Sequence, residues 1–335
     1  MGKARVAVWV VAAAIGLAGE AFAADEPDSG PPQARADAAL SPTPRRARPT
    51  GDEWAMLYLT SIAYGGSAGM FVDGLAQHGN AYATASLAVA LTVPVGAGLG
   101  AVGVAVVNGL VPIRRGVPQT VATGILLGLG EGLALDEWSS NRASTSFHTY
   151  TKDTAWIFGT ATVGLASGIV VSTVVKTTPG RAAWVATTGL FGGVFAGSIA
   201  GALSPQSSFG TKGINAEGNR DVGLTAAIAG LAGAGAGLAS ATALSPSSGR
   251  VHLIDLGWIL GTILPGAACA GAKCNTPGVF GAMAVGGGVG FVGTFLLTMG
   301  MRQQGLTDGT DPFQGVTPYV SPTAGGMQFG LSGPL

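Results

Sequence analysis

The residues of this chain that could do chemistry are few and widely spaced. The histidines are His78, His148 and His252, and their spacing is not that of a metal site. The glycine-rich run around Glu131 matches a dinucleotide-binding fingerprint only in part, and it neither follows a strand pattern nor opens a helix. No phosphate-binding loop or nucleophile elbow is present. The sequence therefore predicts a protein that is not an enzyme and that binds no cofactor and no metal.

Two acidic residues are candidates for an ion or solute pathway. Glu131 lies well inside an apolar segment, and Asp255 lies near His252 in another. An ionisable group at membrane depth is costly, so by default it marks a pathway or a partner. The alternative is that Glu131 faces water or the mouth of a bundle, and that His252 and Asp255 begin a helix at the membrane interface. We favour this alternative, because a lone acid is weak evidence of a pathway.

Cys269 and Cys274 are the two cysteines of the chain. They lie five positions apart in CAGAKC, between two apolar segments. In an oxidising compartment such a short loop permits a disulfide. The alternative is a pair of small buried apolar side chains.

The N-terminus has the three-part pattern of a secretory signal peptide. Lys3 and Arg5 precede an apolar run at 6–17, and Ala21-Phe22-Ala23 forms an A-x-A cleavage site. The run is shorter than the roughly 20 residues that span a bilayer, which argues against a retained anchor helix. We therefore expect a signal peptide at 1–23 and a mature chain that begins near Ala24. Export in turn favours the disulfide.

The composition is not that of a water-soluble domain. Of the 335 residues, 57 are glycine and 10% are charged, and the mean hydropathy is +0.46. Basic and acidic residues number 17 each, so no basic face for nucleic acid is indicated. We expect membrane lipid as a partner and no nucleic acid. Residues 24–51 are rich in proline, alanine and charge, and are expected to form a disordered linker.

From position 52 to 302 the sequence predicts an all-α, glycine-rich membrane domain. About eight apolar segments of about 20 to 27 residues alternate with short polar stretches, a length that suits membrane-spanning helices better than strands. The segments are 53–76, 82–110, 117–137, 153–175, 181–203, 221–244, 252–271 and 277–301. Five tryptophans fall near segment ends, where indole rings fit the headgroup layer: Trp54, Trp138, Trp156, Trp184 and Trp258.

Small residues recur at every fourth position inside these segments, so they form stripes along the expected helices. In water each glycine inside a helix costs about 0.8–1 kcal/mol relative to alanine. In lipid the backbone must stay helical, and a glycine stripe lets two helices approach closely. The stripes therefore favour a bilayer and predict helix packing at Gly65, Gly69, Gly124, Gly128, Gly132, Gly164, Gly168, Gly189, Gly193, Gly197, Gly201, Gly286 and Gly290.

The odd-numbered segments share a degenerate internal repeat. Aligning their first stripe residues places Ser61, Gly124, Gly189 and Gly257 in register. Together with the segment that follows it, each forms a helical hairpin. We expect four αα-hairpin repeats near 52–112, 113–177, 178–246 and 247–302. Through the same packing surfaces the protein is expected to form a homo-oligomer.

The loops and the tail bear on location. Lysines and arginines occur in the loops on both sides of the expected helices, without the cytoplasmic bias of inner-membrane proteins. In the extended tail at 303–335, Met327, Phe329 and Leu331 alternate with smaller or polar residues, as in one β-strand. This tail resembles the C-terminal endings of exported outer-membrane proteins of Gram-negative bacteria, with Leu335 as its last residue. We expect the cell envelope of such a bacterium, with the outer membrane favoured over the inner membrane.

These features predict a non-enzymatic exported membrane protein of structural, pore-like or scaffold type, assembled through glycine-stripe helix packing. One alternative is a small-solute or ion transporter or channel that uses Glu131 and Asp255. Another is a transmembrane β-barrel, which requires the long segments to divide into strands of about 9–11 residues.

Overall fold

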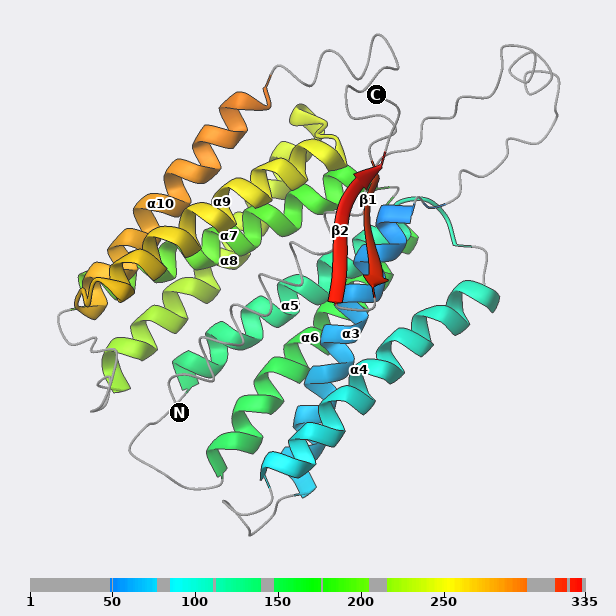
Figure 1. Cartoon of the computed structure of the whole chain (residues 1–335), viewed down its shortest axis with the longest axis horizontal. Coiled ribbons are helices and arrows are strands. Elements are labelled where there is room, and N and C mark those ends of the chain that lie inside the picture. Colours follow the sequence, from blue (N-terminus) through cyan, green and yellow to red (C-terminus); the bar gives the residue numbers. More distant parts are fainter. Residues whose placement is uncertain are drawn as a thin grey trace.

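The computed structural model describes residue 49 and the ranges 51–76, 85–110, 113–139, 148–175, 177–204, 216–299, 317–323 and 326–332. Its helices are α3 Gly51–Ala76, α4 Ala85–Leu110, α5 Val117–Ser139, α6 His148–Val174, α7 Pro179–Leu203, α8 Ala216–Leu244, α9 Ser248–Gly271 and α10 Thr276–Leu297 (Figure 1). The strands are β1 Thr317–Thr323 and β2 Gly326–Ser332. The expected signal peptide at 1–23 and nearly all of the expected linker lie outside the described residues.

The helical prediction is confirmed in its element type and number. The described part of residues 51–299 holds eight helices, and no strand occurs in it. A β-barrel would have required each long segment to divide into strands, so this alternative is not supported. Seven of the eight helices are long and apolar enough to cross a membrane. The exception is α5, which carries Gln119, Glu131, Asp136 and Glu137.

Residue choice at the helix starts explains where two of these helices begin. Thr178 is the N-cap of α7: its side chain accepts a hydrogen bond from the backbone N–H of Arg181, and a proline follows it. At α10 the N-cap is Asn275, which accepts from the N–H of Gly278 at 2.9 Å. Thr276, which has the same place before a proline as Thr178, is instead buried inside the first turn.

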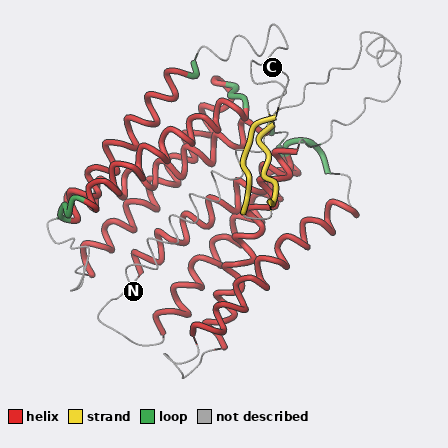
Figure 2. The backbone as a smooth tube through the Cα atoms, in the orientation of Figure 1, coloured by secondary structure: helices red, strands yellow, loops and turns green. Residues whose placement is uncertain are grey.

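The helices form two layers (Figures 1 and 2). α3, α5, α7 and α9 lie in one row, in which each contacts the next. α4, α6, α8 and α10 each pack most extensively on the odd-numbered helix before them in the chain. In addition α6 contacts α3, α8 contacts α5, and α10 contacts α7. α5 therefore lies within the arrangement, with α3, α6, α7 and α8 as neighbours.

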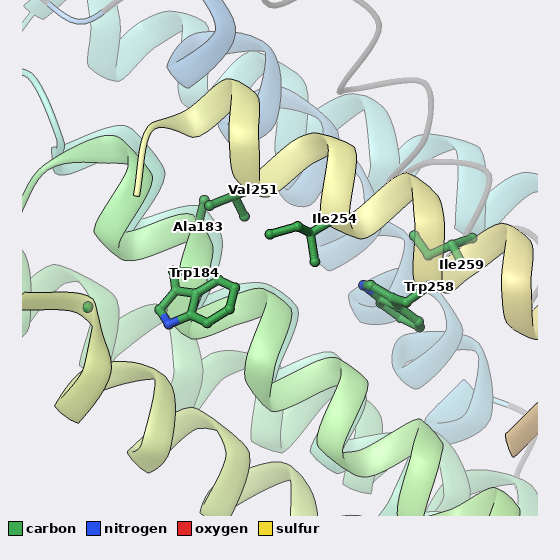
Figure 3. Close-up of a cluster of buried hydrophobic side chains, with 7 residues drawn as sticks. Ala183, Trp184, Val251, Ile254, Trp258 and Ile259 are labelled. Atoms are coloured by element: carbon green, nitrogen blue, oxygen red, sulfur yellow. The ribbon is translucent and has the colours of Figure 1, made fainter. Parts of the chain in front are cut away.

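Two clusters of buried apolar side chains hold the row together. One joins α3 to α5 through Leu57, Val121 and Ile125. The other joins α7 to α9 and includes Trp184 and Trp258, which are 5% and 7% exposed (Figure 3). These two tryptophans were expected at the headgroup layer. Both are buried among the helices, and Trp184 also lies beside Phe291 and Phe295 of α10.

The tail differs from the single strand expected. Met327, Phe329 and Leu331 lie in β2, which pairs with β1 as an antiparallel hairpin from Thr317↔Ser332 to Thr323↔Gly326. An isolated strand would leave its N–H and C=O groups without partners, and pairing within the tail supplies them.

Candidate functional site

Many large apolar side chains on the helices are exposed, and they are the first candidate for a surface that engages a partner. On α4, α6 and α10 the side chains of Leu99, Val163 and Val289 are 66%, 67% and 69% exposed. Exposed large apolar side chains occur on every described helix except α5. So many exposed large apolar side chains on a soluble protein would be an aggregation hazard, and they indicate a membrane or protein interface.

Charged side chains lie inside the same domain. Glu53, at the start of α3, is fully buried. Its Oε2 accepts a hydrogen bond from the N–H of Gly116 at 2.5 Å, and its Oε1 lies 3.7 Å from Nε of Arg115. Gly116 has a φ of +87°, and a Cβ there would collide with the carbonyl oxygen of Thr177. The turn before α5 is thus bonded to the start of α3. In the sequence, the only indication of this contact is the acidic residue Glu53 at the start of an apolar segment.

Charged side chains are buried at both ends of the bundle, as Arg250 and two aspartates show. Arg250, at the start of α9, is 5% exposed, and its Nε donates to Oγ1 of Thr298 at 3.3 Å. Its guanidinium also lies 5.0 Å from the ring centroid of Phe295. Towards the other end, Asp73 of α3 and Asp136 of α5 are buried. The domain therefore encloses charged groups and exposes large apolar ones, a distribution that suits lipid better than water.

Glu131 lies among packed helices. It is half-buried on α5, and a Cβ built on Gly230 of α8 would lie less than 3.0 Å from its Oε1. One turn earlier, the side chain of Leu127 reaches Gly189 of α7. The carboxyl group thus sits where α5 meets α7 and α8.

Asp255 has a different setting, on α9. Its Oδ1 accepts a hydrogen bond from Nε1 of Trp258 at 2.9 Å, one turn along the same helix. The extensive contacts of α9 are with α7 and α10, whereas Glu131 faces α8 from α5. No described contact brings the two acids together, so a pathway that uses both is not favoured.

Several glycines lie where two helices approach closely. At three of them two glycines face each other, and a Cβ on either one would lie less than 3.0 Å from the carbonyl oxygen of the other. These pairs are Gly65 with Gly96, Gly124 with Gly164, and Gly261 with Gly286. Five more stripe glycines face atoms of the partner helix as closely: Gly69, Gly128, Gly132, Gly168 and Gly290. Backbone lies against backbone here, and no side chain fits without movement.

The stripe on α7 is spread over three neighbours. Gly189 faces α5 and α8, and Gly201 faces α10. Gly193 and Gly197 face α8, where each built Cβ would lie 3.1 Å from an atom of Ala226. The α7 stripe is therefore looser at its middle than the crossing of Gly124 with Gly164.

Cys269 and Cys274 are joined by a disulfide in the turn between α9 and α10. The sulfur atoms are 2.10 Å apart and the Cα atoms 5.3 Å apart. The N–H of Cys274 also donates to the carbonyl oxygen of Cys269 at 2.9 Å, and Lys273 adopts a positive φ of 59°. The bridge closes the last hairpin at the end where Asn275 caps α10.

A polar pocket of about 250 Å³ lies where α7 and α9 begin. Arg115, Arg181, Ser247 and Ser248 are among its lining residues. The pocket has basic and hydroxyl groups but no acid or histidine in its lining to act as a general base. Among the residues that the structure describes, no group of three or more His, Cys, Asp or Glu side chains is placed to hold a metal ion.

No family model, curated protein or solved structure matches this chain. Its function is therefore argued from its own surfaces and contacts.

Proposed function

We propose that this chain is a non-enzymatic membrane protein of structural, pore-like or scaffold type, with membrane lipid as its partner and without a cofactor. The observation that carries this proposal is the combination of seven helices able to span a membrane with exposed apolar side chains around them. Moving one such side chain from water into an apolar medium contributes about 1.5–3 kcal/mol, so an exterior covered by them favours lipid strongly.

The four hairpins are proposed to be repeats of one packing unit. Each odd-numbered helix places at least one backbone carbonyl oxygen less than 3.0 Å from the Cβ built on a glycine of the next helix. The four crossings nearest the register of the sequence repeat are Ser61 with Gly100, Gly124 with Gly164, Thr188 with Gly233, and Gly257 with Gly290. Three of the four carbonyls belong to residues that the sequence repeat aligns, and the third hairpin differs by one position. The glycines thus serve the same structural purpose in each hairpin.

The proposed location is the cell envelope of a Gram-negative bacterium, reached through a cleaved signal peptide. Within the envelope the outer membrane is favoured over the inner membrane. The support is that basic residues lie at both ends of the bundle: Arg114, Arg115 and Arg181 at one end, and Lys152 and Lys273 at the other. Inner-membrane proteins concentrate lysine and arginine on the cytoplasmic side, and this chain lacks such a one-sided distribution.

Membrane flotation and alkaline extraction of the full chain test the proposal, followed by separation of inner and outer membranes on a density gradient. We expect the chain to float with lipid, to resist extraction at high pH and to follow the outer membrane. Recovery of a soluble periplasmic monomer without detergent would show that the membrane assignment is wrong. Selective ion or solute flux in reconstituted vesicles, lost on Glu131→Gln, would favour a transporter instead.

A further inference from the structure

The four close crossings give a common register for the odd-numbered helices. We treat Ser61 of α3, Gly124 of α5, Thr188 of α7 and Gly257 of α9 as equivalent, because each offers its carbonyl oxygen to a glycine of the following helix and lies within one position of the sequence repeat. The residues four before, one before and three after these positions lie on one helix face. We call this face the forward row. Its members are Leu57, Thr60 and Tyr64 on α3; Thr120, Thr123 and Leu127 on α5; Trp184, Thr187 and Phe191 on α7; and Leu253, Leu256 and Leu260 on α9.

On α3 and α5 the forward row meets the next hairpin. Leu57 packs in a cluster with Val121 and Ile125 of α5. The hydroxyl groups of Tyr64 and Thr162 of α6 lie 3.2 Å apart. From α5, Oγ1 of Thr123 donates to a carbonyl oxygen of α7 at 3.0 Å.

On α7 the forward row has the same use. Trp184 packs in the cluster with Val251 and Ile254 of α9 (Figure 3). Phe191 stacks on Phe291 of α10, with ring centroids 4.2 Å apart. In each of the first three hairpins this face is therefore the interface to the hairpin that follows.

The fourth forward row has no such neighbour in the described structure. In the first three hairpins the leading two residues are between 2% and 7% exposed. On α9 Leu253, Leu256 and Leu260 are 37%, 38% and 39% exposed, and Leu264, one turn further, is 61% exposed. All three members of the row on α9 are leucines, whereas the leading positions of the other rows are mostly threonines and a tryptophan. The row on α9 is therefore an exposed apolar ridge, which we call the leucine ridge, at one end of the stack of four hairpins.

The other end of the stack, at α4, also presents an exposed helix face. α6, α8 and α10 each pack on the odd-numbered helix of the preceding hairpin, whereas the extensive contacts of α4 are with α3 alone. Phe158 and Thr162 of α6 contact Tyr64 of α3, and the equivalent positions on α4 are Pro94 and Gly98. Both are exposed, and nothing lies within 4 Å of a Cβ built on Gly98. Only these two positions are small: Leu91, one turn before Pro94, and Val102, one turn after Gly98, are large and exposed.

We propose that copies of this chain associate head to tail, with the leucine ridge of α9 in one copy packing on α4 and the adjacent face of α3 in the next copy. The contact continues the interface that already joins the hairpins within one chain, and it places the leucine ridge over the gap left by Pro94 and Gly98. It rests on the proposed membrane placement, because a shared bilayer keeps the odd-numbered helices of both copies parallel. Such an interface is heterologous, so the assembly is a closed ring or an open row.

Cross-linking between two tagged versions of the full chain tests the proposal. One version carries Leu260→Cys, and the other carries Gly98→Cys and a different tag. Both native cysteines are held in a disulfide, so each version has one free thiol. The two versions are co-expressed, and their membranes are treated with a short bismaleimide. We expect a cross-linked dimer that carries both tags. The matched control is Val289→Cys on the outer face of α10, paired with Gly98→Cys, and it should lack that dimer.

Each outcome decides the arrangement. Dimers with both tags from Leu260→Cys and Gly98→Cys, and not from the control, support head-to-tail association. Dimers of Leu260→Cys chains alone would overturn it in favour of a two-fold contact between α9 helices. A chain that floats with membranes but forms no specific dimer would show that the leucine ridge faces lipid. Loss of flotation would contradict the membrane placement itself, so the two failures are distinguishable.

Discussion

Single glycines decide how closely the helices of this protein approach. At the crossing of Gly124 with Gly164 the backbones touch, so atoms along several turns of α5 and α6 come within contact distance. One pair of carbon atoms gains only about 0.1–0.2 kcal/mol from dispersion, and the contact is stabilising because many pairs form together. α6 also carries Gly159, which has open space around it, so position and not composition separates packing glycines from others.

Gly164→Ala and Gly159→Ala on α6 test this distinction with the same chemical change. A Cβ at Gly164 would collide with α5, whereas nothing lies within 4 Å of a Cβ at Gly159. We expect Gly164→Ala to destabilise the fold by about 1–3 kcal/mol through overpacking. Gly159→Ala should be neutral, or should stabilise by up to about 1 kcal/mol through helix propensity. Thermal unfolding in detergent measures both, and equal melting temperatures would contradict the close-packed crossing.

Gly193→Leu and Val194→Leu compare adjacent faces of α7. Gly193 faces α8, where even a Cβ would lie 3.1 Å from the carbonyl oxygen of Ala226, and Val194 packs beside the apolar cluster of α7 and α9. We expect Gly193→Leu to lower stability more, by about 1–3 kcal/mol, although leucine is the better helix former. The measurement is thermal unfolding of the two variants. A Gly193→Leu variant as stable as the parent would show that α7 and α8 separate easily.

At the scale of elements, the sequence predicts the lengths of the helices well, but it predicts the residues at which they begin less well. The segment expected at 181–203 is α7 at Pro179–Leu203, and the one expected at 117–137 is α5 at Val117–Ser139. Long apolar runs bounded by polar residues give helices of this length in any packing arrangement. The cap of α10 depends on which side-chain oxygen reaches a free N–H, and Asn275 and Thr276 both qualify by type. Only the geometry of the turn selects Asn275.

The turn between α9 and α10 gives an element-scale prediction. Replacing both Cys269 and Cys274 with serine opens a loop of only a few residues, so the expected loss is about 2 kcal/mol in the chain-entropy account of disulfides. Ala270→Ser, in the same region with the bridge intact, should change little. Thermal unfolding compares the variants. Mass spectrometry after alkylation of native material should find both thiols protected until a reductant is added, and alkylation without reduction would contradict the bridge.

At the scale of the whole molecule, the order of the layers could not be predicted from the sequence. α5 and α7 carry similar glycine stripes, yet only α5 has no exposed large apolar side chain among its described residues. That difference depends on which helices surround each one, and helix contacts distant in sequence leave little periodic signal. The bond from Gly116 to Glu53 is of the same kind, since it joins residues far apart in the chain. The acids singled out in advance, Glu131 and Asp255, were visible because they interrupt apolar runs.

Val289→Asp distinguishes a lipid-facing exterior from a water-facing one, because the substitution should be nearly neutral in water and strongly unfavourable in lipid. Val289 lies near the middle of α10 and is 69% exposed. On a water-exposed helix such a change usually alters stability by less than about 0.5 kcal/mol. At the centre of a bilayer a carboxylate costs about 2.5–3.5 kcal/mol on the scale of membrane insertion, which is enough to reduce the inserted fraction strongly.

The measurement for Val289→Asp is the yield of chain that resists alkaline extraction, with Val289→Leu as the size-matched apolar control. We expect the leucine variant to match the parent and the aspartate variant to be depleted from the membrane fraction. The same pair at Val251, which is fully buried, should be damaging in either environment and so reports on folding alone. An aspartate at position 289 that leaves the yield unchanged, or makes the chain soluble without detergent, would mean that water covers this face and that the apolar exterior serves protein contacts.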